Sequence, residues 1–411
     1  MGNTPNVRFK GFTEDWEQRK VTDLGEIYIG LVTTMTEHYT DSGHLLIRNS
    51  DIKDGYFEFG ENPIYLDEEF SEQNKSRMHQ LGDVITVHTG DIGTSAVIGE
   101  NEVNSIGFAT IVTRPNQEKL DSNYFATYLN TDTHKQWAIS MATGDGRSNY
   151  NLKDYTKLVV PIPEIEEQKK IAACIGNLNN LITLHQQKCD ETKELKKYML
   201  QNMFPQKDEK VPKIRFAGFT GDWKQRKLGE VAEFNPKSEL PEVFEYVDLE
   251  SVVGTEMVSH RTEIKDSAPS RAQRLAQVGD VFYQTVRPYQ KNNYLFEKPD
   301  NNYVFSTGYA QLRPFIDARF LMSYLQTEDF VKVVMDNCTG TSYPAINSSD
   351  LANIKISLSN NSTEQQQIGT YFSNLGNLIT LHQQKCNALK EFKKYMLQNM
   401  FPQKGENKCQ N

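Results

Sequence analysis

The sequence predicts an α+β fold: two mixed α/β domains in a pseudo-two-fold arrangement, separated by two long antiparallel helices that form an intramolecular coiled coil. Three observations support this prediction. The chain contains two copies of one unit, each copy includes a segment with the spacing of a long helix, and the residues between these segments are rich in short strand-like stretches. With 411 residues, of which 37% are hydrophobic and 24% charged, the chain is long enough for two or three globular domains.

The internal repeat determines the predicted domain organisation. The repeated segments are Val7–Lys20 with Ile214–Lys227, Asn177–Cys189 with Asn374–Cys386, and Lys196–Lys207 with Lys393–Lys404. The last pair is identical and the middle pair differs at one position, whereas residues 28–160 and 235–357 share only faint landmarks. We call the near-identical repeated segments the frame. A constant frame around unlike inserts indicates two interchangeable domains on a shared scaffold. The predicted parts are a first domain at 1–162, a first spacer helix at 163–207, a second domain at 208–358, and a second spacer helix with a short tail at 359–411.

Each spacer segment has a heptad seam of apolar residues with a polar middle. The predicted seam residues are Ile171, Ile175, Leu178, Ile182, His185 and Met199 in the first helix, and Ile368, Phe372, Leu375, Ile379, His382 and Met396 in the second. Pro205 and Pro402 end both helices in the same register, and Thr363 with Gln366 fits a capping box at the second helix start. Because one such seam needs a partner and the chain supplies one matching partner, we expect the two helices to pack antiparallel.

The inserts are typical of mixed α+β domains, because their apolar stretches are short and rich in β-branched and aromatic residues. The predicted strands are Asp83–His88, Ala109–Val112, Lys157–Ile162, Asp280–Gln284 and Ile354–Leu358, and the predicted short helices are Tyr124–Asn130 and Arg319–Gln326.

Composition narrows the class of protein. No apolar run approaches the ~20 residues of a membrane span, and the first residues lack the apolar core of a signal peptide, so we expect a cytoplasmic protein without membrane contact. The five cysteines are scattered and form no C-x-x-C pair, which suits a reducing compartment. The net charge of −9 counts against nucleic-acid binding over the whole surface. However, Gln187–Lys227 holds eleven Lys or Arg against six Asp or Glu.

The duplicated landmarks resemble the specificity subunits of type I restriction-modification enzymes. The residues that carry the resemblance are the helix approaches Pro161–Glu164 and Ile356–Ser359, each followed by Glu-Gln at 167–168 and 364–365; the opening motifs Phe9–Trp16 and Phe216–Trp223; and the insert motifs Ile47–Gly55, Gly82–Val84, Thr89–Gly93 and Gly279–Val281. The second helix approach lacks the prolines of the first. The resemblance covers nearly the whole chain, and the duplicated order is more specific than any single motif.

This resemblance implies a subunit without an active site. Its two target-recognition domains would each read one half of a split DNA site, and its helices would set the gap between the halves. The implied partners are double-stranded DNA, two modification (methyltransferase) subunits and two ATP-dependent restriction subunits. S-adenosylmethionine, ATP and Mg²⁺ would belong to those partners, with no cofactor or metal on this chain.

Polar loops in the inserts contain the predicted base-reading residues, because Arg suits guanine edges and Asn or Gln suits adenine edges. The candidate DNA-binding residues are Thr89, Thr94, Arg147, Asn149, Tyr150 and Asn151 in the first insert, and Arg271, Arg274, Arg287, Tyr289, Gln290, Lys291, Asn292, Thr341, Ser342 and Tyr343 in the second. Ordinary turn chemistry is the competing interpretation. Candidate phosphate or partner contacts are the Lys and Arg residues at 188, 193, 196, 197, 224, 226 and 227.

Other chemistries receive little support. The sequence has no phosphate-binding G-x-x-x-x-G-K-[ST] loop and no Asn-Pro-Pro-Tyr motif. The Glu-x-Lys triplets at 191–193 and 263–265 are common chance occurrences, and the His185–Cys189 spacing is better explained by polar seam residues than by a metal site. The remaining alternative is a two-headed scaffold that binds protein ligands and has no DNA role.

Overall fold

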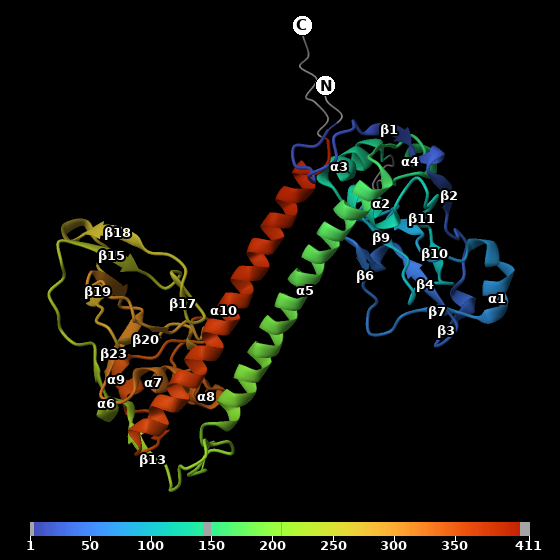
Figure 1. Ribbon diagram of the computed structural model, residues 1–411. Coiled ribbons are helices and arrows are strands. Elements are labelled where there is room, and N and C mark those ends of the chain that lie inside the picture. Colours follow the sequence, from blue (N-terminus) through green and yellow to red (C-terminus); the bar gives the residue numbers. More distant parts are fainter. Residues whose placement is uncertain (1–3, 143–148, 207, 403–411) are drawn as a thin grey trace. The chain divides into compact units, whose positions relative to one another are not determined.

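The computed structural model describes residues 4–142, 149–206 and 208–402, which divide into two compact units. The first unit is built from the described residues up to Leu184 and from Lys385 onward, and the second spans His185–Gln384. Helices α5 (Ile165–Asn202) and α10 (Ser362–Asn399) each contribute one half to each unit (Figure 1). Across the described ranges, no helix has both the length and the hydrophobicity of a membrane span.

The first unit contains two four-stranded sheets among its described residues. One sheet is antiparallel, in the order β2 (Gly25–Ile29), β11 (Ile111–Pro115), β8 (Val84–Thr86), β9 (Ser95–Val97). The other has the order β10 (Ile106–Phe108), β4 (His44–Arg48), β7 (Tyr65–Leu66), β3 (Tyr39–Thr40), with β10 and β4 parallel. The remaining elements are the hairpin β5 (Ile52–Lys53) and β6 (Tyr56–Phe57), the pair β1 (Glu17–Lys20) and β12 (Val159–Ile162), and helices α1 (Glu68–Gln73), α2 (Ser122–Leu129), α3 (Asp132–Met141) and α4 (Leu152–Tyr155).

The second unit repeats this plan with different sequences. Its antiparallel sheet has the order β14 (Ala232–Phe234), β23 (Tyr309–Pro314), β20 (Val281–Gln284), β21 (Tyr294–Leu295). Its other sheet has the order β18 (Arg261–Ile264), β15 (Val243–Val247), β22 (Tyr303–Ser306), β19 (Ala272–Leu275), with β15 and β22 parallel. The remaining elements are the hairpin β16 (Val252–Val253) and β17 (Glu256–Met257), the pair β13 (Lys224–Lys227) and β24 (Lys355–Leu358), and helices α6 (Leu228–Val231), α7 (Ala318–Leu325), α8 (Glu328–Asp336) and α9 (Ser348–Asn353).

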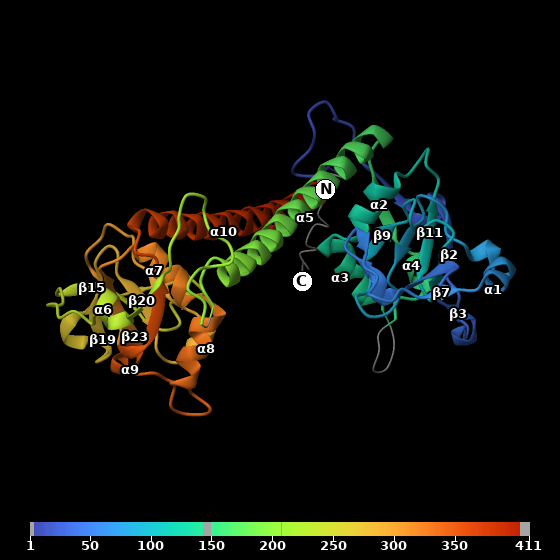
Figure 2. The ribbon, with the colours of Figure 1, turned by 90° about the horizontal axis from the view of Figure 1, so that it is seen from below.

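The predicted α+β fold class is confirmed. Each predicted strand overlaps an observed one, namely β8, β11, β12, β20 and β24, and the two predicted short helices are α2 and α7. In each unit, one of these short helices packs on the antiparallel sheet: α2 beside β9 in the first and α7 beside β20 in the second (Figure 2). The main core of each unit lies between that sheet, the short helices and the long helices.

The long helices pack antiparallel within each unit, as predicted. In the second unit, the Nδ1 atoms of His185 and His382 are 3.0 Å apart, and the Phe204 and Phe372 rings stack at 5.8 Å. The chain just beyond the end of α5 therefore packs against an early residue of α10, whereas the two histidines meet near the middle of both helices. In the first unit, Cys386 lies beside the carbonyl of Ile182. The seam is buried near the helix starts and again at Cys189 and Cys386, and its middle contains polar residues such as His185 and His382, as the sequence predicts.

The start of each long helix is fixed by the repeated Glu-Gln pair. Glu167 is fully buried and accepts two hydrogen bonds from the Arg8 guanidinium, at 2.7 and 2.8 Å. Arg215 makes the same bidentate contact with Glu364 in the second unit. The neighbouring Gln168 accepts a hydrogen bond from the Asp121 amide that precedes α2 and donates to the Pro163 carbonyl. The repeated opening segment is thereby attached to the helix of its own copy.

The end of each long helix completes the core of a unit. Phe401, just after α10, packs edge-on against Trp16 at 6.1 Å in the first unit. Phe204, just after α5, packs in the same way against Trp223 in the second. The identical Met-Phe-Pro segments thus fill equivalent positions beside the two repeated tryptophans. This explains why the opening motif and the helix end recur together in the sequence.

The predicted capping box at the start of α10 is wrong. The helix begins at Ser362, and the side-chain oxygen of Asn361 accepts hydrogen bonds from the amides of Thr363 and Glu364, at 2.9 and 3.3 Å. Thr363 therefore lies inside the first turn, and Asn361 caps the helix.

Candidate nucleic-acid interface

In the first unit, two predicted loops meet at the end of the antiparallel sheet. The first follows β8 and the second leads into α4. The Tyr150 amide donates to the His88 carbonyl at 2.9 Å, and the His88 ring contacts the Tyr150 carbonyl at 2.6 Å. The Thr89 hydroxyl then donates to the Asn149 side chain at 2.6 Å. Thr89 and Asn149 are both half-buried and stand together where the two loops meet.

The equivalent loops meet in the second unit, after β20 and after α8. The Arg287 amide donates to the Pro344 carbonyl at 2.8 Å, and the Arg287 guanidinium carbon lies 4.4 Å from the centre of the Tyr343 ring. Tyr343 is 65% exposed, so this cation–π pair lies at the surface. Thr341 and Ser342 are exposed beside it. The structure therefore brings together two sets of residues that are more than fifty positions apart in the sequence.

Backbone geometry in the loop after β20 is unusual. Arg287 and Lys291 both adopt left-handed conformations, with φ of 54° and 57°. Residues with a Cβ adopt this region at a cost, and such strained positions are enriched at functional sites. The loop is held by hydrogen bonds from Lys291 to Glu328, at 2.6 Å, and from Gln284 to Gln290, at 2.9 Å. Tyr289, at the tip, is 50% exposed.

The predicted residue Arg274 lies on β19, which pairs with β22 in the other sheet, and Arg271 directly precedes this strand. The Thr307 amide donates to the Arg271 carbonyl, and the Thr285 amide donates to the Gly308 carbonyl, so the β22–β23 turn connects Arg271 to the loop after β20. Arg271 is exposed. Arg274 is half-buried, and burial lowers the pKa of its guanidinium. Its Nε has no hydrogen-bond partner in the part of the chain that the structure describes.

The sequence analysis did not single out Asn49. Its side-chain oxygen accepts from the His88 amide at 2.8 Å, and its Nδ2 donates to the carbonyls of Phe108 and Ala109. Asn49 thus connects the loop after β8 with the β10–β11 turn. In the second unit, the β22–β23 turn makes the corresponding connection to the loop after β20. The Ile47–Gly55 motif contains this residue, but only the fold shows which member of the motif reaches the loops.

Two predicted contact residues do not reach the surface. Tyr150 is fully buried against Trp137 and Tyr155, and its burial raises the pKa of the hydroxyl far above its usual value. Thr94 is fully buried and donates to Asp91 at 2.6 Å. Both side chains hold the loop after β8 rather than face a ligand. Arg147 lies outside the described residues, and Asn151 directly precedes α4.

Lys196 also departs from its predicted role as a phosphate or partner contact. It is half-buried on α5 and lines a cleft with Glu256, whereas Lys188, Lys193 and Lys197 are exposed on the same helix. Every residue of β13, including Lys224, is exposed. The strand and the exposed helix lysines therefore stay available to phosphates.

The described residues of the loops hold donors for nucleobase edges and rings for stacking. Arg, Lys, Asn and Gln side chains at one surface suit direct base reading. No group of three or more His, Cys, Asp or Glu residues that is able to hold a metal occurs within the described ranges. His185 and His382 instead contact each other in the seam, which agrees with the interpretation as register-fixing residues.

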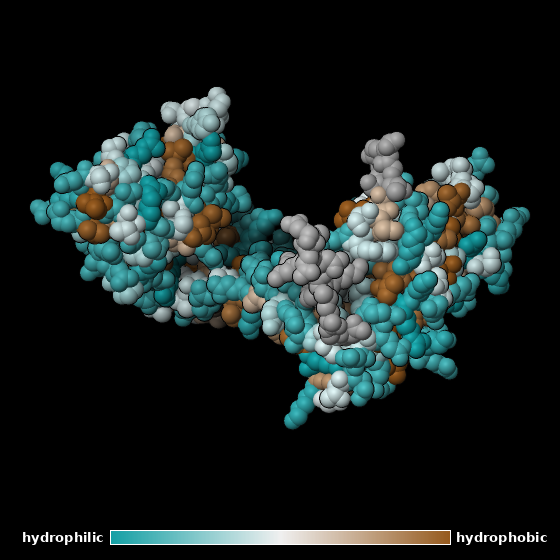
Figure 3. All heavy atoms as spheres, turned by 90° about the horizontal axis from the view of Figure 1, so that it is seen from above, coloured by the Kyte–Doolittle hydropathy of each residue, from teal (hydrophilic) through white to brown (hydrophobic). Residues whose placement is uncertain are grey.

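The constant helices expose large hydrophobic side chains in a repeated pattern. The first unit exposes Leu181, Leu184, Phe392 and Tyr395, and the second exposes Leu378, Leu381, Leu195 and Tyr198. These are equivalent positions at the offset of 197. On the face drawn in Figure 3, hydrophobic side chains form separate patches on a mainly hydrophilic surface. Large hydrophobic side chains are thus exposed at equivalent positions of the two helices, and exposed apolar side chains that gather on a surface often mark a protein interaction site.

Comparison with known proteins identifies the family. The profile described as the type I restriction modification DNA specificity domain matches residues 13–194 and again residues 220–391. The type I restriction enzyme MjaVIII specificity subunit of Methanocaldococcus jannaschii is 22% identical over 347 residues, which cover 79% of each protein. A protein of the same organism named for an MjaX specificity subunit is 25% identical over 224 residues. In that comparison the match spans about half of each chain, 53% of this one and 52% of the relative.

A solved structure shares the fold over nearly the whole chain. The crystal structure of the type I restriction-modification system S subunit from M. genitalium superposes with a TM-score of 0.61 at 16% identity, and the match covers 98% of this chain and 100% of that one. The two profile matches together include both sets of loops and most of both long helices. The chain therefore belongs to the type I restriction-modification DNA specificity family, whose domain it carries twice.

Proposed function

We propose that this chain is the non-catalytic DNA-specificity subunit of a cytoplasmic type I restriction-modification complex. Each domain reads one half of a bipartite DNA site, and the paired helices set the gap between the halves. The observation that carries the proposal is the pairing of unlike polar loops with a duplicated constant frame. The loop pairs around Thr89 and Arg287 occupy equivalent positions on the same plan but present different side chains. Different side chains at equivalent positions suit two different half-sites.

Local charge supports DNA as the ligand despite the net charge of −9. Phosphate contacts need positive charge only where the backbone lies, and they position the protein without specifying sequence. Exposed Lys and Arg on β13 and along α5 supply such contacts, and the loops supply base-reading side chains. The alternative function is a scaffold that binds two protein ligands through its loops. Such a scaffold does not need exposed phosphate contacts together with base-reading side chains.

The duplicated apolar patches support two copies of one partner. We assign them to two methyltransferase (modification) subunits, because identical side chains on each unit offer the same surface twice. Two ATP-dependent restriction subunits would complete the assembly. S-adenosylmethionine, ATP and Mg²⁺ would bind to those partners.

The test is a DNA-binding measurement on the chain assembled with its methyltransferase. Selection from a randomised duplex library should recover a split sequence, and the affinity for that sequence should fall steeply with salt because counterions are released. Binding to a protein ligand without salt-dependent DNA selection would favour the two-headed scaffold. Replacing residues 28–160 with another insert should alter one half of the selected sequence only, and a change in both halves would contradict independent domains.

A further inference from the structure

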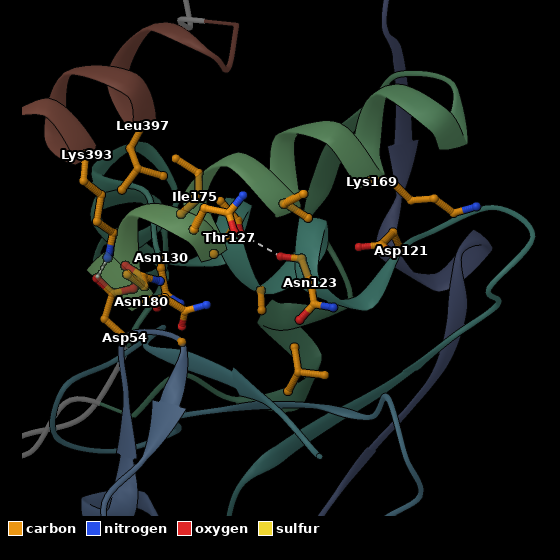
Figure 4. Close-up of a pocket in the computed structure, with 18 residues that line it drawn as sticks. Asp54, Asp121, Asn123, Thr127, Asn130, Lys169, Ile175, Asn180, Lys393 and Leu397 are labelled. Carbon is orange, nitrogen blue, oxygen red and sulfur yellow. Dashed lines mark hydrogen bonds and ion pairs between the residues drawn. The ribbon is translucent and has the colours of Figure 1, made fainter. Parts of the chain in front are cut away.

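In the first unit, the hairpin β5–β6 reaches from the recognition domain to the constant helix α10. Its turn places Oδ2 of Asp54 3.1 Å from Nζ of Lys393. The Lys393 side chain is only 15% exposed. Figure 4 shows Lys393 pointing toward Asp54, and both residues line a cleft of about 440 Å³ together with residues of α2 and α5. The ion pair therefore joins a residue of the variable insert to a residue of the repeated helix.

The second unit contains an equivalent cleft with an equivalent hairpin. Its helix lysine is Lys196, at the offset of 197 from Lys393 and within the identical twelve-residue segment. The acid that lines the same cleft is Glu256, which accepts a hydrogen bond from the Thr380 hydroxyl on α10. Burial lowers the pKa of Lys196, while the negative charge of Glu256 raises it. Both clefts are thus lined by a carboxylate of the hairpin and by the same lysine of the constant frame, and the two groups form a direct ion pair in the first unit.

The acids do not occupy the same position in the two hairpins. Asp54 lies in the turn between β5 and β6, whereas Glu256 is the first residue of β17. The surrounding hairpin sequences also differ, Ile52–Phe57 against Val252–Met257. Two unlike hairpins therefore offer a carboxylate to one constant lysine from different positions. The shared feature is the charge at that place in the fold rather than an inherited sequence.

Each hairpin also contacts the loops that we assign to base reading. In the second unit, the Gly254 amide donates to the Asn292 side chain at 2.8 Å, and Asn292 belongs to the loop after β20. In the first unit, the Gly55 amide donates to the Ser95 carbonyl at 3.0 Å, and Ser95 directly follows the loop after β8. Ile52 is buried in the same cluster as Val87. One hairpin therefore contacts both the constant helix and the reading loop of its domain.

We infer that Lys393 and Lys196 are positioning residues. Each lysine holds the acidic hairpin of the recognition domain that packs beside it. The hairpin in turn fixes the reading loop of that domain relative to the constant helices. This inference rests on the proposed DNA-reading function. It explains how unlike inserts share one frame, because an insert needs only a correctly placed carboxylate on this hairpin. An insert that lacks this carboxylate should be held less firmly against the constant helices and should read its half-site less selectively.

The experiment uses the complete complex with Lys393→Glu, Lys393→Met and the double variant Lys393→Glu/Asp54→Lys. Lys390→Glu is the matched control, because Lys390 is an exposed residue one turn earlier on α10. Hydrogen–deuterium exchange without DNA should rise in residues 52–57 and 87–94 for both single Lys393 variants. Exchange should return toward the wild-type rate in the double variant. Lys390→Glu should leave both segments unchanged.

Selection from a randomised duplex library gives the second readout. Lys393→Glu should lower selectivity for the first half-site roughly tenfold, since like charges in contact are strongly unfavourable, and should leave the second half unchanged. Lys393→Met keeps the packing of the aliphatic stem, so its melting temperature separates misplacement from misfolding. Equal exchange and equal selectivity in the Lys393 and Lys390 variants would overturn the inference. If the wild-type complex selects no split site, the proposed function fails, and the exchange data alone then decide whether Lys393 holds the hairpin.

Discussion

Buried carboxylates at the helix starts illustrate how single residues preserve this frame. Glu167 and Glu364 are fully buried, and each is neutralised by one arginine from the opening segment of its copy. A buried carboxylate is tolerated only when it is paired and hydrogen-bonded. The arginine and the glutamate are therefore retained together, although more than 140 residues separate them in each copy. Because this ion pair involves only the two repeated residues, the inserts between them are free to differ.

Arg287 is the residue for which we predict the clearest effect on specificity. Its guanidinium is held over Tyr343, and its backbone is held in a left-handed conformation, so its direction is fixed before DNA binds. Arg287→Ala should lower selectivity at one position of the second half-site by about 1–3 kcal/mol, the usual size of one bidentate base contact. Library selection measures this effect.

Lys224→Ala, by contrast, should weaken binding to all sequences equally and should reduce the salt slope by about one. A uniform loss in Arg287→Ala would assign that residue to phosphate contact instead.

His79 should make the stability of the first unit depend on pH. It is buried beside Ser105, and burial lowers the pKa of His79 from about 6.5 to about 4. Between these values the unfolded chain binds a proton that the folded chain does not, so stability is complete above pH 6.5 and falls as pH drops toward 4. The loss approaches roughly 3 kcal/mol.

The aligned position in the second unit is Ala276, which has no titratable group. Hydrogen exchange in β4 and β10, measured from pH 7 to pH 4.5, should therefore show the effect, and His79→Ala should remove it. An unchanged pH slope in His79→Ala would contradict this assignment.

Among the elements, the long and periodic ones were predictable from the sequence and the short ones were not. The heptad spacing predicted α5 and α10, and the apolar runs predicted β8 and β20. Two-residue strands such as β5 and β16 leave no periodic signal, because a strand of that length is defined by its partner across the sheet. The hairpin clefts were missed for that reason.

The candidate site was predictable to a similar degree. Polar composition identified the loops, but burial of Tyr150 and Thr94 depends on packing partners that are distant in the sequence. The contact between Arg287 and Tyr343 likewise appears only in the fold.

The start of α10 tests which residue caps a helix when several candidates are adjacent. Asn361 accepts from two otherwise unpaired amides of the first turn, whereas Thr363 already lies within the helix. Asn361→Ala should lower the free energy of unfolding by about 1 kcal/mol, and Thr363→Ala should change it by much less. Denaturant melts of the two variants compare them directly. A larger loss in Thr363→Ala would restore the capping box that the sequence suggests.

At the scale of the whole molecule, the two copies differ in their inserts and agree in the repeated segments that surround the inserts. Each unit contains the start of one long helix and the end of the other, and the helix ends supply identical aromatic residues to both cores. Each of the two identical helix segments therefore packs beside a different insert and lines one of the two equivalent clefts. A change in one copy of the helix that is not matched in the other would alter the seam on one side only. This requirement accounts for the near-identity of the helices beside unlike inserts.

The length of the helices should determine the gap in the recognised DNA. Deleting residues 186–192 and 383–389 removes one heptad from each helix, so the seam keeps its register while both helices become roughly 10 Å shorter. At 3.4 Å per base pair this shortening corresponds to about three base pairs. The deletion leaves both loop pairs, both hairpins and the seam starts in place. Mapping methylated sites in cells that carry the shortened chain should therefore give both original half-sites with a smaller gap between them. Removing the heptad from only one helix breaks the pairing and should abolish methylation, which makes it the matched control. Original half-sites at the original gap in the doubly shortened chain would show that the helices do not set the distance.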